Sequence, residues 1–204
     1  MSRPNKMKRI CALLVVVLAI LSIACSTPPT VVSKNSSPPS ASTSAGQLQF
    51  KTPDGWASET PSSSMRVAQY QLPPSEGDTE AASLVVFYFG AGQGGSVQAN
   101  LDRWVNQIQQ PDGSSSKDKA RTETLTVNGM NVTLLDVSGI YGGGDMGRAP
   151  AQGRTNFRMR AGVIETPSGG YFVKLVGPEK TVSKWDDSFM AFIKSAEFTS
   201  GFKG

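Results

Sequence analysis

The sequence predicts an α+β domain built on a mainly antiparallel β-sheet that two helices cover. Most of residues 48–198 consists of short apolar or alternating segments separated by Gly, Pro and Asn, which is typical of strands joined by turns. Two longer segments, about 96–110 and 181–196, repeat apolar residues at helical spacing. Strands follow one another directly on both sides of the first helix, which favours antiparallel pairing.

The first half of the domain contains four predicted extended segments. Residues 50–56 form two short pieces around the turn Pro53-Asp54-Gly55. Residues 65–72 alternate as a half-buried strand does, and Pro73-Pro74 ends them. Residues 83–89, SLVVFYF, are apolar on both faces, which predicts a central strand covered on both sides.

Two hairpins make up the second half of the predicted sheet. Residues 122–141 fold back at Asn128-Gly129, the favoured type I′ turn, and the adjacent Leu135 and Val137 indicate a bulge. Residues 156–165 and 171–176 flank a turn of sequence TPSGG. Phe198 adds a last short strand.

Each predicted helix has one apolar stripe. Ser96 is placed to cap the first helix, whose stripe is Val97, Leu101, Trp104, Val105 and Ile108. The stripe of the second is Val182, Trp185, Phe189, Phe192, Ile193 and Ala196. We therefore expect Trp104 and Trp185 in the core, whereas Trp56 follows a turn and is either buried or exposed.

The first 24 residues have the three parts of an export signal. A basic start is followed by an almost unbroken apolar run, residues 10–20, which is shorter than a membrane span needs. The next segment, Leu21-Ser22-Ile23-Ala24-Cys25, resembles the lipobox of bacterial lipoproteins. The resemblance implies cleavage between Ala24 and Cys25, acylation of Cys25 and anchoring in a bilayer. Ser26 implies the outer membrane if the cell has two. The alternatives are an ordinary signal peptide and an uncleaved anchor.

The predicted organisation is a signal peptide at 1–24, a lipidated cysteine and disordered linker at 25–47, and one domain at 48–204. Residues 26–46 are rich in Ser, Thr, Pro and Ala and nearly free of apolar side chains, so they cannot form a core. Four of the 20 basic residues precede Cys25, which leaves 16 basic and 16 acidic residues after it. This balance argues against nucleic-acid binding. Cys11 is lost with the signal and Cys25 is blocked, so we expect no disulfide.

The order of elements resembles the PsbP-like superfamily of α-β-α sandwich domains. The residues that carry the resemblance are Phe50, the segment 53–56, the segment 170–175 (GYFVKL), Gly177-Pro178, Phe189 and Ser195. That superfamily includes the photosystem II extrinsic subunit, a Ran-binding nuclear-transport factor and bacterial lipoproteins. Its members are mostly docking or assembly proteins, so the resemblance implies a sandwich fold and a binding role without catalysis.

The sequence lacks the residues that several catalytic mechanisms require. The chain contains no histidine, which removes histidine-activated nucleophiles, and with no free thiol we expect no zinc or copper site and no cofactor. A calcium site made of oxygen ligands stays open, but no EF-hand-like spacing of acids occurs, so we assign no metal ligand. Ser114-Ser115-Ser116-Lys117 fits the S-x-x-K motif of serine acyl-enzymes, but it lies in a polar tract without the partner motifs. Asp186 and Asp187 are neighbours on a helix, which favours a solvated face over a carboxylate pair.

Two features are candidates for contacts with a partner or an anion. Residues 90–95, GAGQGG, match G-x-G-x-x-G between a strand and a helix, but no parallel second strand follows. We interpret them as a turn that needs positive φ, with Gly92, Gly94 and Gly95 as candidate contacts. Arg158 and Arg160 lie two apart on one strand, which favours a solvent-facing sheet edge, with an anionic ligand or partner as the alternative.

The resulting hypothesis is a lipoprotein of the cell envelope that is not an enzyme. Its domain acts as a binding or assembly module for an unknown envelope protein, through the glycine-rich loops at 90–95 and 142–153. One alternative is a carrier that holds a small apolar ligand between sheet and helices. The other is a hydrolase that works without histidine.

Overall fold

A computed structural model describes residues 47–143 and 153–200 of the 204-residue chain. The helices are α1 (Val97–Val105), α2 (Ser116–Lys119), α3 (Glu179–Lys184) and α4 (Asp186–Lys194). The strands are β1 (Gln47–Gln49), β2 (Ala57–Ser58), β3 (Arg66–Leu72), β4 (Ala82–Tyr88), β5 (Ile108–Gln109), β6 (Arg121–Val127), β7 (Met130–Tyr141), β8 (Arg154–Thr166), β9 (Gly169–Pro178) and β10 (Glu197–Thr199).

Eight of the strands form one sheet in the order β2-β3-β4-β9-β8-β7, with β5 and β6 both paired to β7. Every pairing in this sheet is antiparallel. The predicted α+β class is confirmed. The segment 83–89, predicted to be central, corresponds to β4, which lies between β3 and β9.

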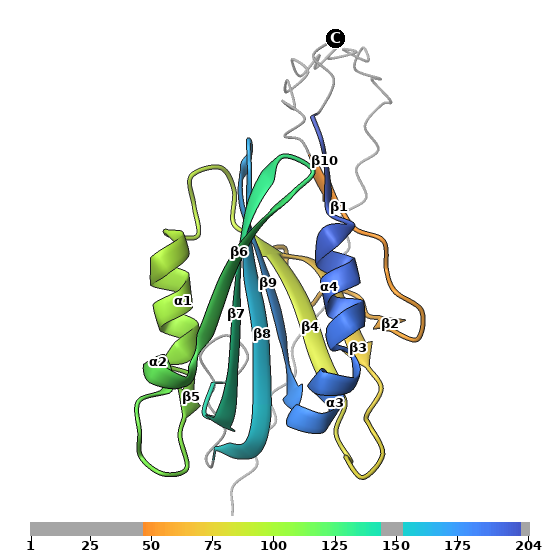
Figure 1. The fold of residues 1–204 in the computed structure, drawn as a ribbon. Helices are drawn as coiled ribbons and strands as arrows, with labels where there is room; N and C mark the ends of the chain where they lie inside the picture. The colour runs from red at the N-terminus through yellow and green to blue at the C-terminus, as the bar shows by residue number, and fades with distance from the viewer. Residues whose placement is uncertain (1–46, 144–152, 201–204) are drawn as a thin grey trace, which may run out of the picture. The chain divides into compact units, whose positions relative to one another are not determined.

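Helices cover both faces of the sheet, as the α-β-α arrangement requires. Figure 1 shows α1 and α2 on one side of the sheet and α3 and α4 on the other. The first face, which we call the α1 face, buries Leu101 and Trp104 of the helix against apolar side chains of β7, β8 and β9. The second, the α4 face, buries Phe189, Phe192 and Ile193 against the opposite side of the same sheet. The strands β7, β8 and β9 therefore contribute alternate side chains to two cores.

The Asn128-Gly129 hairpin is confirmed, and its register explains how one face of it is buried. Val127 pairs with Met130, and both central residues have positive φ, as a type I′ turn requires. The Asn128 side chain donates to the Ala196 carbonyl at 2.8 Å, which ties the turn to the C-terminal end of α4. The expected common face lies on the α4 side, where Leu125 is partly buried and the others are buried: Val127, Met130, Val132 and Leu134.

Four local expectations are corrected. The first helix ends at Val105 and not near residue 110, and Ile108, expected on its stripe, lies in β5, where it pairs with Tyr141 of β7. The bulge expected at Leu135 and Val137 is absent, because β6 and β7 pair without interruption through Asp136; both residues face the α1 side of a strand buried on two faces. The irregularity of β7 lies instead between Gly139 and Tyr141. Residues 50–56 contain no strand, and short strands lie on either side of them. The last helix is two helices, because Trp185 leaves the helical conformation at φ −99° and ψ 8°.

The first described strand, β1, pairs along its whole length with β10, the last strand of the described residues. Leu48 pairs with Phe198 of β10, and its backbone N–H donates to the Tyr171 hydroxyl at 3.3 Å. Phe50 then stacks on Phe192, with ring centroids 4.3 Å apart. In Figure 1, β1 and β10 lie at one end of the domain, whereas α2 and β5 lie at the opposite end.

Candidate functional site

The glycine-rich turn before α1 has the backbone that was expected. Gly90, Gly92, Gly94 and Gly95 all have positive φ. Ser96 caps the helix by accepting from the Ala99 N–H at 3.2 Å. The Ala99 N–H in the first turn of the helix is thus satisfied by the chain itself, and an anion contact at this loop stays a prediction.

The three candidate glycines differ in what surrounds them. Gly92 has nothing within 4 Å of the position where a Cβ would lie, and Gly92 and Gly95 are exposed. A Cβ on Gly94 would lie 2.5 Å from the ring of Phe172. The Asn100 side chain also donates to the Gly94 carbonyl at 2.9 Å. Gly94 therefore has a packing role, and a contact with a partner through the exposed loop stays a prediction.

Arg158 and Arg160 do lie on one face of one strand, but that strand is not an edge. β8 lies between β7 and β9, and both side chains point to the α4 face. Only 15% and 9% of the two side chains is exposed. The expectation of a solvent-facing sheet edge is wrong, because the α4 layer extends over this part of the sheet.

A carboxylate on the neighbouring strand joins the two arginines. Arg158 donates from Nε and Nη2 to the two oxygens of Asp136, each at 2.8 Å. Arg160 donates to Asp136 Oδ2 at 3.2 Å. Burial by itself raises the pKa of Asp136, but the hydrogen bonds and charges of both arginines outweigh it and hold this pKa below its usual value.

Asp186, the first residue of α4, adds a second carboxylate. Its oxygens lie 3.5 Å from Arg158 Nη2 and 3.2 Å from Arg160 Nε. Asp187, by contrast, is exposed. The expectation of a solvated face therefore holds for Asp187 and fails for Asp186, which turns toward the sheet.

These four residues, Asp136, Arg158, Arg160 and Asp186, form what we call the charge cluster. Arg160 also lies over the ring of Phe189 at 5.3 Å, and Arg158 donates to the Ser183 hydroxyl at 3.0 Å. Buried charges need such partners, because an isolated one costs several kcal/mol or more. The cluster joins the α3 and α4 layer to the sheet, and its guanidinium groups are paired within the chain.

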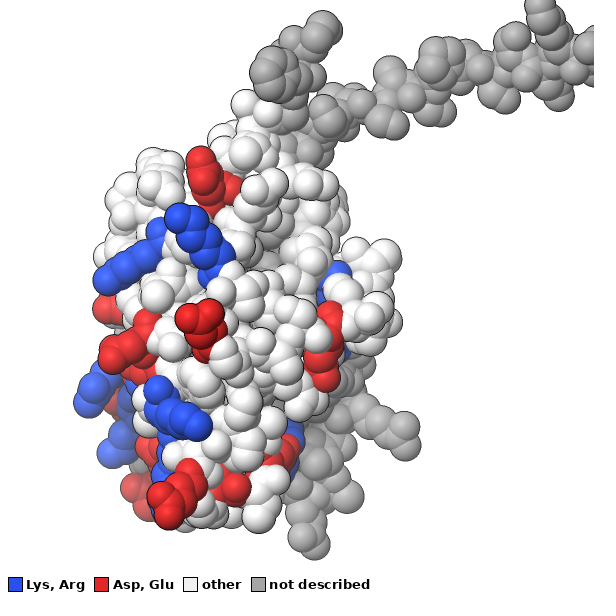
Figure 2. All heavy atoms as spheres, turned by 90° about the vertical axis from the view of Figure 1, so that its right-hand side faces the viewer, with Lys and Arg blue, Asp and Glu red and all other residues white. Residues whose placement is uncertain are grey.

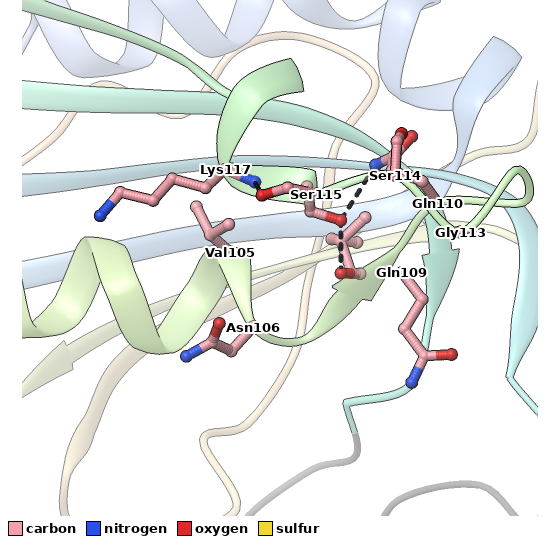
Figure 3. A pocket seen from close by; sticks show the side chains of 10 residues that line it. Val105, Asn106, Gln109, Gln110, Gly113, Ser114, Ser115 and Lys117 are labelled. Atoms are coloured by element: carbon pink, nitrogen blue, oxygen red, sulfur yellow. Dashed lines mark hydrogen bonds between the residues drawn. The ribbon is translucent and has the colours of Figure 1, made fainter.

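A concavity of about 440 Å³ lies at the other side of the sheet, between the end of α1, β5 and α2 (Figure 3). Its walls are Val105, Asn106, Ile108, Gln109, Gln110, Gly113, Ser114, Ser115, Ser116 and Lys117. Val105 and Ile108 are buried and supply an apolar floor. The remaining lining is polar and contains no carboxylate.

The S-x-x-K residues line this concavity, and their hydroxyl groups hold the loop together. Ser114 Oγ donates to Asp112 at 2.6 Å, and its hydrogen bonds hold the pKa of Asp112 below the usual value. Ser115 accepts from the backbone N–H of Lys117 at 3.2 Å. Ser116 donates to the Ile108 carbonyl at 2.7 Å. In Figure 3 the Lys117 side chain points away from the serines, so the geometry is that of a capped turn and not of a serine–lysine pair.

Three other side chains of the lining make no hydrogen bond or ion pair within the described part of the chain: Asn106, Gln109 and Lys117. The loop that carries Lys117 is nevertheless well held. Gln110 donates from its amide to the Ser116 hydroxyl at 3.0 Å and to the Ser138 carbonyl at 2.9 Å. The concavity is therefore formed before any ligand arrives, with unused donors and acceptors at its rim.

The space between the sheet and α4 is filled by aromatic rings. Trp56, which the sequence left as either buried or exposed, is buried. Its ring centroid lies 5.2 Å from that of Phe192. Tyr70 lies 5.7 Å from the same ring. Trp104 is in the core as expected, whereas Trp185 is only half-buried and donates to the Pro73 carbonyl. An apolar ligand between sheet and α4 would have to displace these rings.

Some expectations fall outside the described residues. These include Ala24, Cys25, the linker and most of the second glycine-rich loop, residues 144–152. Within residues 47–143 and 153–200, no helix combines the length and the apolar character that crossing a membrane requires. The same residues contain no grouping of three acidic, Cys or His side chains suited to a metal ion.

No family model and no curated protein matches the sequence. Among solved structures, the fold is similar to that of LpqN from Mycobacterium tuberculosis, a protein involved in cell envelope biogenesis. The TM-score is 0.50 at 12% identity, over 76% of this chain and 84% of LpqN. At this identity the similarity shows a shared fold alone.

Two further solved structures are more distant. PA94 of Pseudomonas aeruginosa, a protein of unknown function, has a TM-score of 0.43 at 16% identity, over 74% of this chain and 95% of its own. The cyanobacterial PsbP of Synechocystis has a TM-score of 0.43 at 11% identity, over 76% and 93%. From these two we infer nothing about function.

Proposed function

We propose that this chain is an exported lipoprotein whose single domain is a non-enzymatic binding module of the cell envelope. The anchor is the acylated Cys25, which follows a basic start, an apolar run and the lipobox-like segment Leu21–Cys25. Two or more acyl chains give stable membrane attachment, whereas one gives marginal binding. LpqN, which shares the fold, is involved in cell envelope biogenesis, and this supports an envelope role.

The observation that carries the binding role is the preformed concavity with unpartnered polar side chains. Its loop is fixed by the Gln110, Ser114 and Ser116 hydrogen bonds, so little ordering would be needed on binding. The concavity also lies near α2 and β5, at the end of the domain opposite β1, where the linker joins. A site at that end stays accessible when the other end is tethered.

Site-specific photo-crosslinking in cells tests the binding role. A photoreactive residue replaces Gln109 at the concavity, and the matched control carries it at Lys194, which is exposed on α4. We expect a discrete crosslinked product from position 109 and none from position 194. Equal labelling from both positions, or none from position 109, would remove the concavity as the binding site.

A further inference from the structure

The lining of the concavity indicates which kind of ligand it takes. It offers the carboxamides of Asn106 and Gln109, one ammonium group on Lys117 and a floor of two aliphatic side chains. Carboxamides both donate and accept hydrogen bonds, which suits hydroxyl and carbonyl groups. The described residues of the lining include no carboxylate and no aromatic ring, and the carboxylate of neighbouring Asp112 accepts from Ser114; this disfavours a cation and a flat apolar ligand. The favoured ligand is therefore compact, hydroxyl-rich and neutral or negatively charged.

The size of the concavity supports the same class. Small-molecule sites occupy roughly 300–1,000 Å³, and about 440 Å³ lies in the lower part of that range. A single sugar ring or a short oligosaccharide end fits this space, whereas a protein segment would need a longer groove. Val105 and Ile108 then provide apolar surface for the C–H face of the ring, while the lining residues Asn106 and Gln109 offer carboxamides to its hydroxyl groups.

Lys117 adds a preference for a negative charge. Its backbone is fixed because the Ser115 hydroxyl accepts from its N–H, but its ammonium group has no partner within the described residues. Its side chain belongs to the lining of the concavity and, in Figure 3, extends from α2 away from the serines. From these contacts we infer that the concavity binds a sugar unit and prefers one that carries a carboxylate. The inference rests on the proposed binding role and assigns a ligand class to the same site.

Saturation-transfer NMR with D-glucuronate and D-glucose tests the inference. The full chain is used in dodecylphosphocholine, a detergent without a sugar group. We expect saturable transfer to both sugars, and tighter binding of glucuronate by roughly 2–5-fold, the ratio expected for one exposed ion pair. Acetate at the same concentration should not compete with glucose, which separates recognition of the sugar ring from attraction of the charge alone.

Two lysine variants make the test specific. Lys117→Gln should remove the preference for glucuronate while glucose still binds. Lys119→Gln removes an exposed charge from the same short helix but outside the lining, and should leave the preference unchanged. Both changes are on the surface, so each should alter the free energy of unfolding by no more than about 0.5 kcal/mol.

Absence of saturable transfer to either sugar, or a preference that Lys117→Gln leaves intact, would overturn the assignment. Either result leaves the proposed function standing if photo-crosslinking at position 109 still captures a product. Conversely, if the chain binds sugar but is never acylated in cells, the ligand class stands and the proposal of a lipoprotein fails.

Discussion

The two faces of the sheet differ in how their polar and charged side chains are partnered. On the α4 face, aromatic rings fill the space under the helix, and the charge cluster pairs every guanidinium with a carboxylate of the chain. On the α1 face, the nine-residue helix ends beside a concavity where Asn106, Gln109 and Lys117 have no partner within the described residues. Buried charges require partners, whereas polar groups at a rim can remain available to a ligand. Both faces bury apolar cores, and the polar side chains without partners at the end of α1 are the reason that the binding role is proposed for the α1 face.

Among the variants that test this comparison, truncation of Phe192 should lower the free energy of unfolding most. Its side chain is fully buried and contacts the rings of Phe50, Trp56 and Tyr70. We expect Phe192→Ala to lower the free energy of unfolding by about 3–5 kcal/mol, measured by urea denaturation. Val67→Ala, at a side chain that is 46% exposed, should change it by no more than about 0.5 kcal/mol. Similar costs for the two variants would contradict the packing described for the α4 face.

Disrupting the charge cluster should cause the second-largest loss in the free energy of unfolding. Asp136→Asn leaves two guanidinium groups without their shared carboxylate, so we expect a loss of about 2–3 kcal/mol, below the cost for a fully buried pair. The matched control is Asp187→Asn, since Asp187 is exposed and neighbours Asp186. If both variants unfold at the same urea concentration, the cluster does not stabilise the α4 layer.

On the α1 face, the two glycines Gly92 and Gly94 differ in their surroundings. Both have positive φ, so alanine is strained at either position. Only at Gly94 would the new Cβ meet the ring of Phe172. We expect Gly94→Ala to cost about 1–2 kcal/mol more than Gly92→Ala, because overpacking adds to the backbone strain. Equal thermal midpoints for the two variants would show that the Phe172 ring can move aside without a measurable loss of stability.

The smallest effect is a dependence on pH. Because the folded-state pKa of Asp136 is lowered, its contribution to stability is present above the unfolded value of about 3.9 and is lost as the pH falls through the lower folded value. The difference in unfolding free energy between the natural chain and Asp136→Asn should therefore shrink below about pH 4. A difference that stays constant from neutral pH to pH 3 would mean that the arginines do not lower this pKa.

The sequence was sufficient for the parts of the fold that rest on periodicity and turn chemistry. The Asn128-Gly129 hairpin, the central position of β4 and the stripe of α1 as far as Val105 follow from spacing and turn chemistry; Ile108, expected on the same stripe, lies in β5. The break at Trp185 does not, because no Pro or Gly marks it; the Trp185 side chain instead donates to Pro73, more than a hundred residues away. Long-range contacts of this kind leave no local signal.

The candidate site was harder to predict for the same reason. The spacing of Arg158 and Arg160 correctly placed them on one face, but only the position of α4 shows that this face is covered. The concavity depends on β5 pairing with the end of β7 and on Gln110 reaching the Ser138 carbonyl. Ser114–Lys117 fits a catalytic motif in sequence, but its hydrogen bonds to Asp112, the Ile108 carbonyl and the Lys117 N–H make it a capped turn.

The central claim is that the chain reaches the envelope as a lipoprotein anchored at Cys25. The most direct measurement is the intact mass and N-terminal peptide of the protein purified from membranes of the cells that make it. We predict a mature chain that begins at Cys25 and carries a diacylglyceryl group on its sulfur, and a Cys25→Ser variant that loses the lipid mass. A chain that keeps residues 1–24, or one that begins elsewhere with a free Cys25 thiol, would contradict the claim.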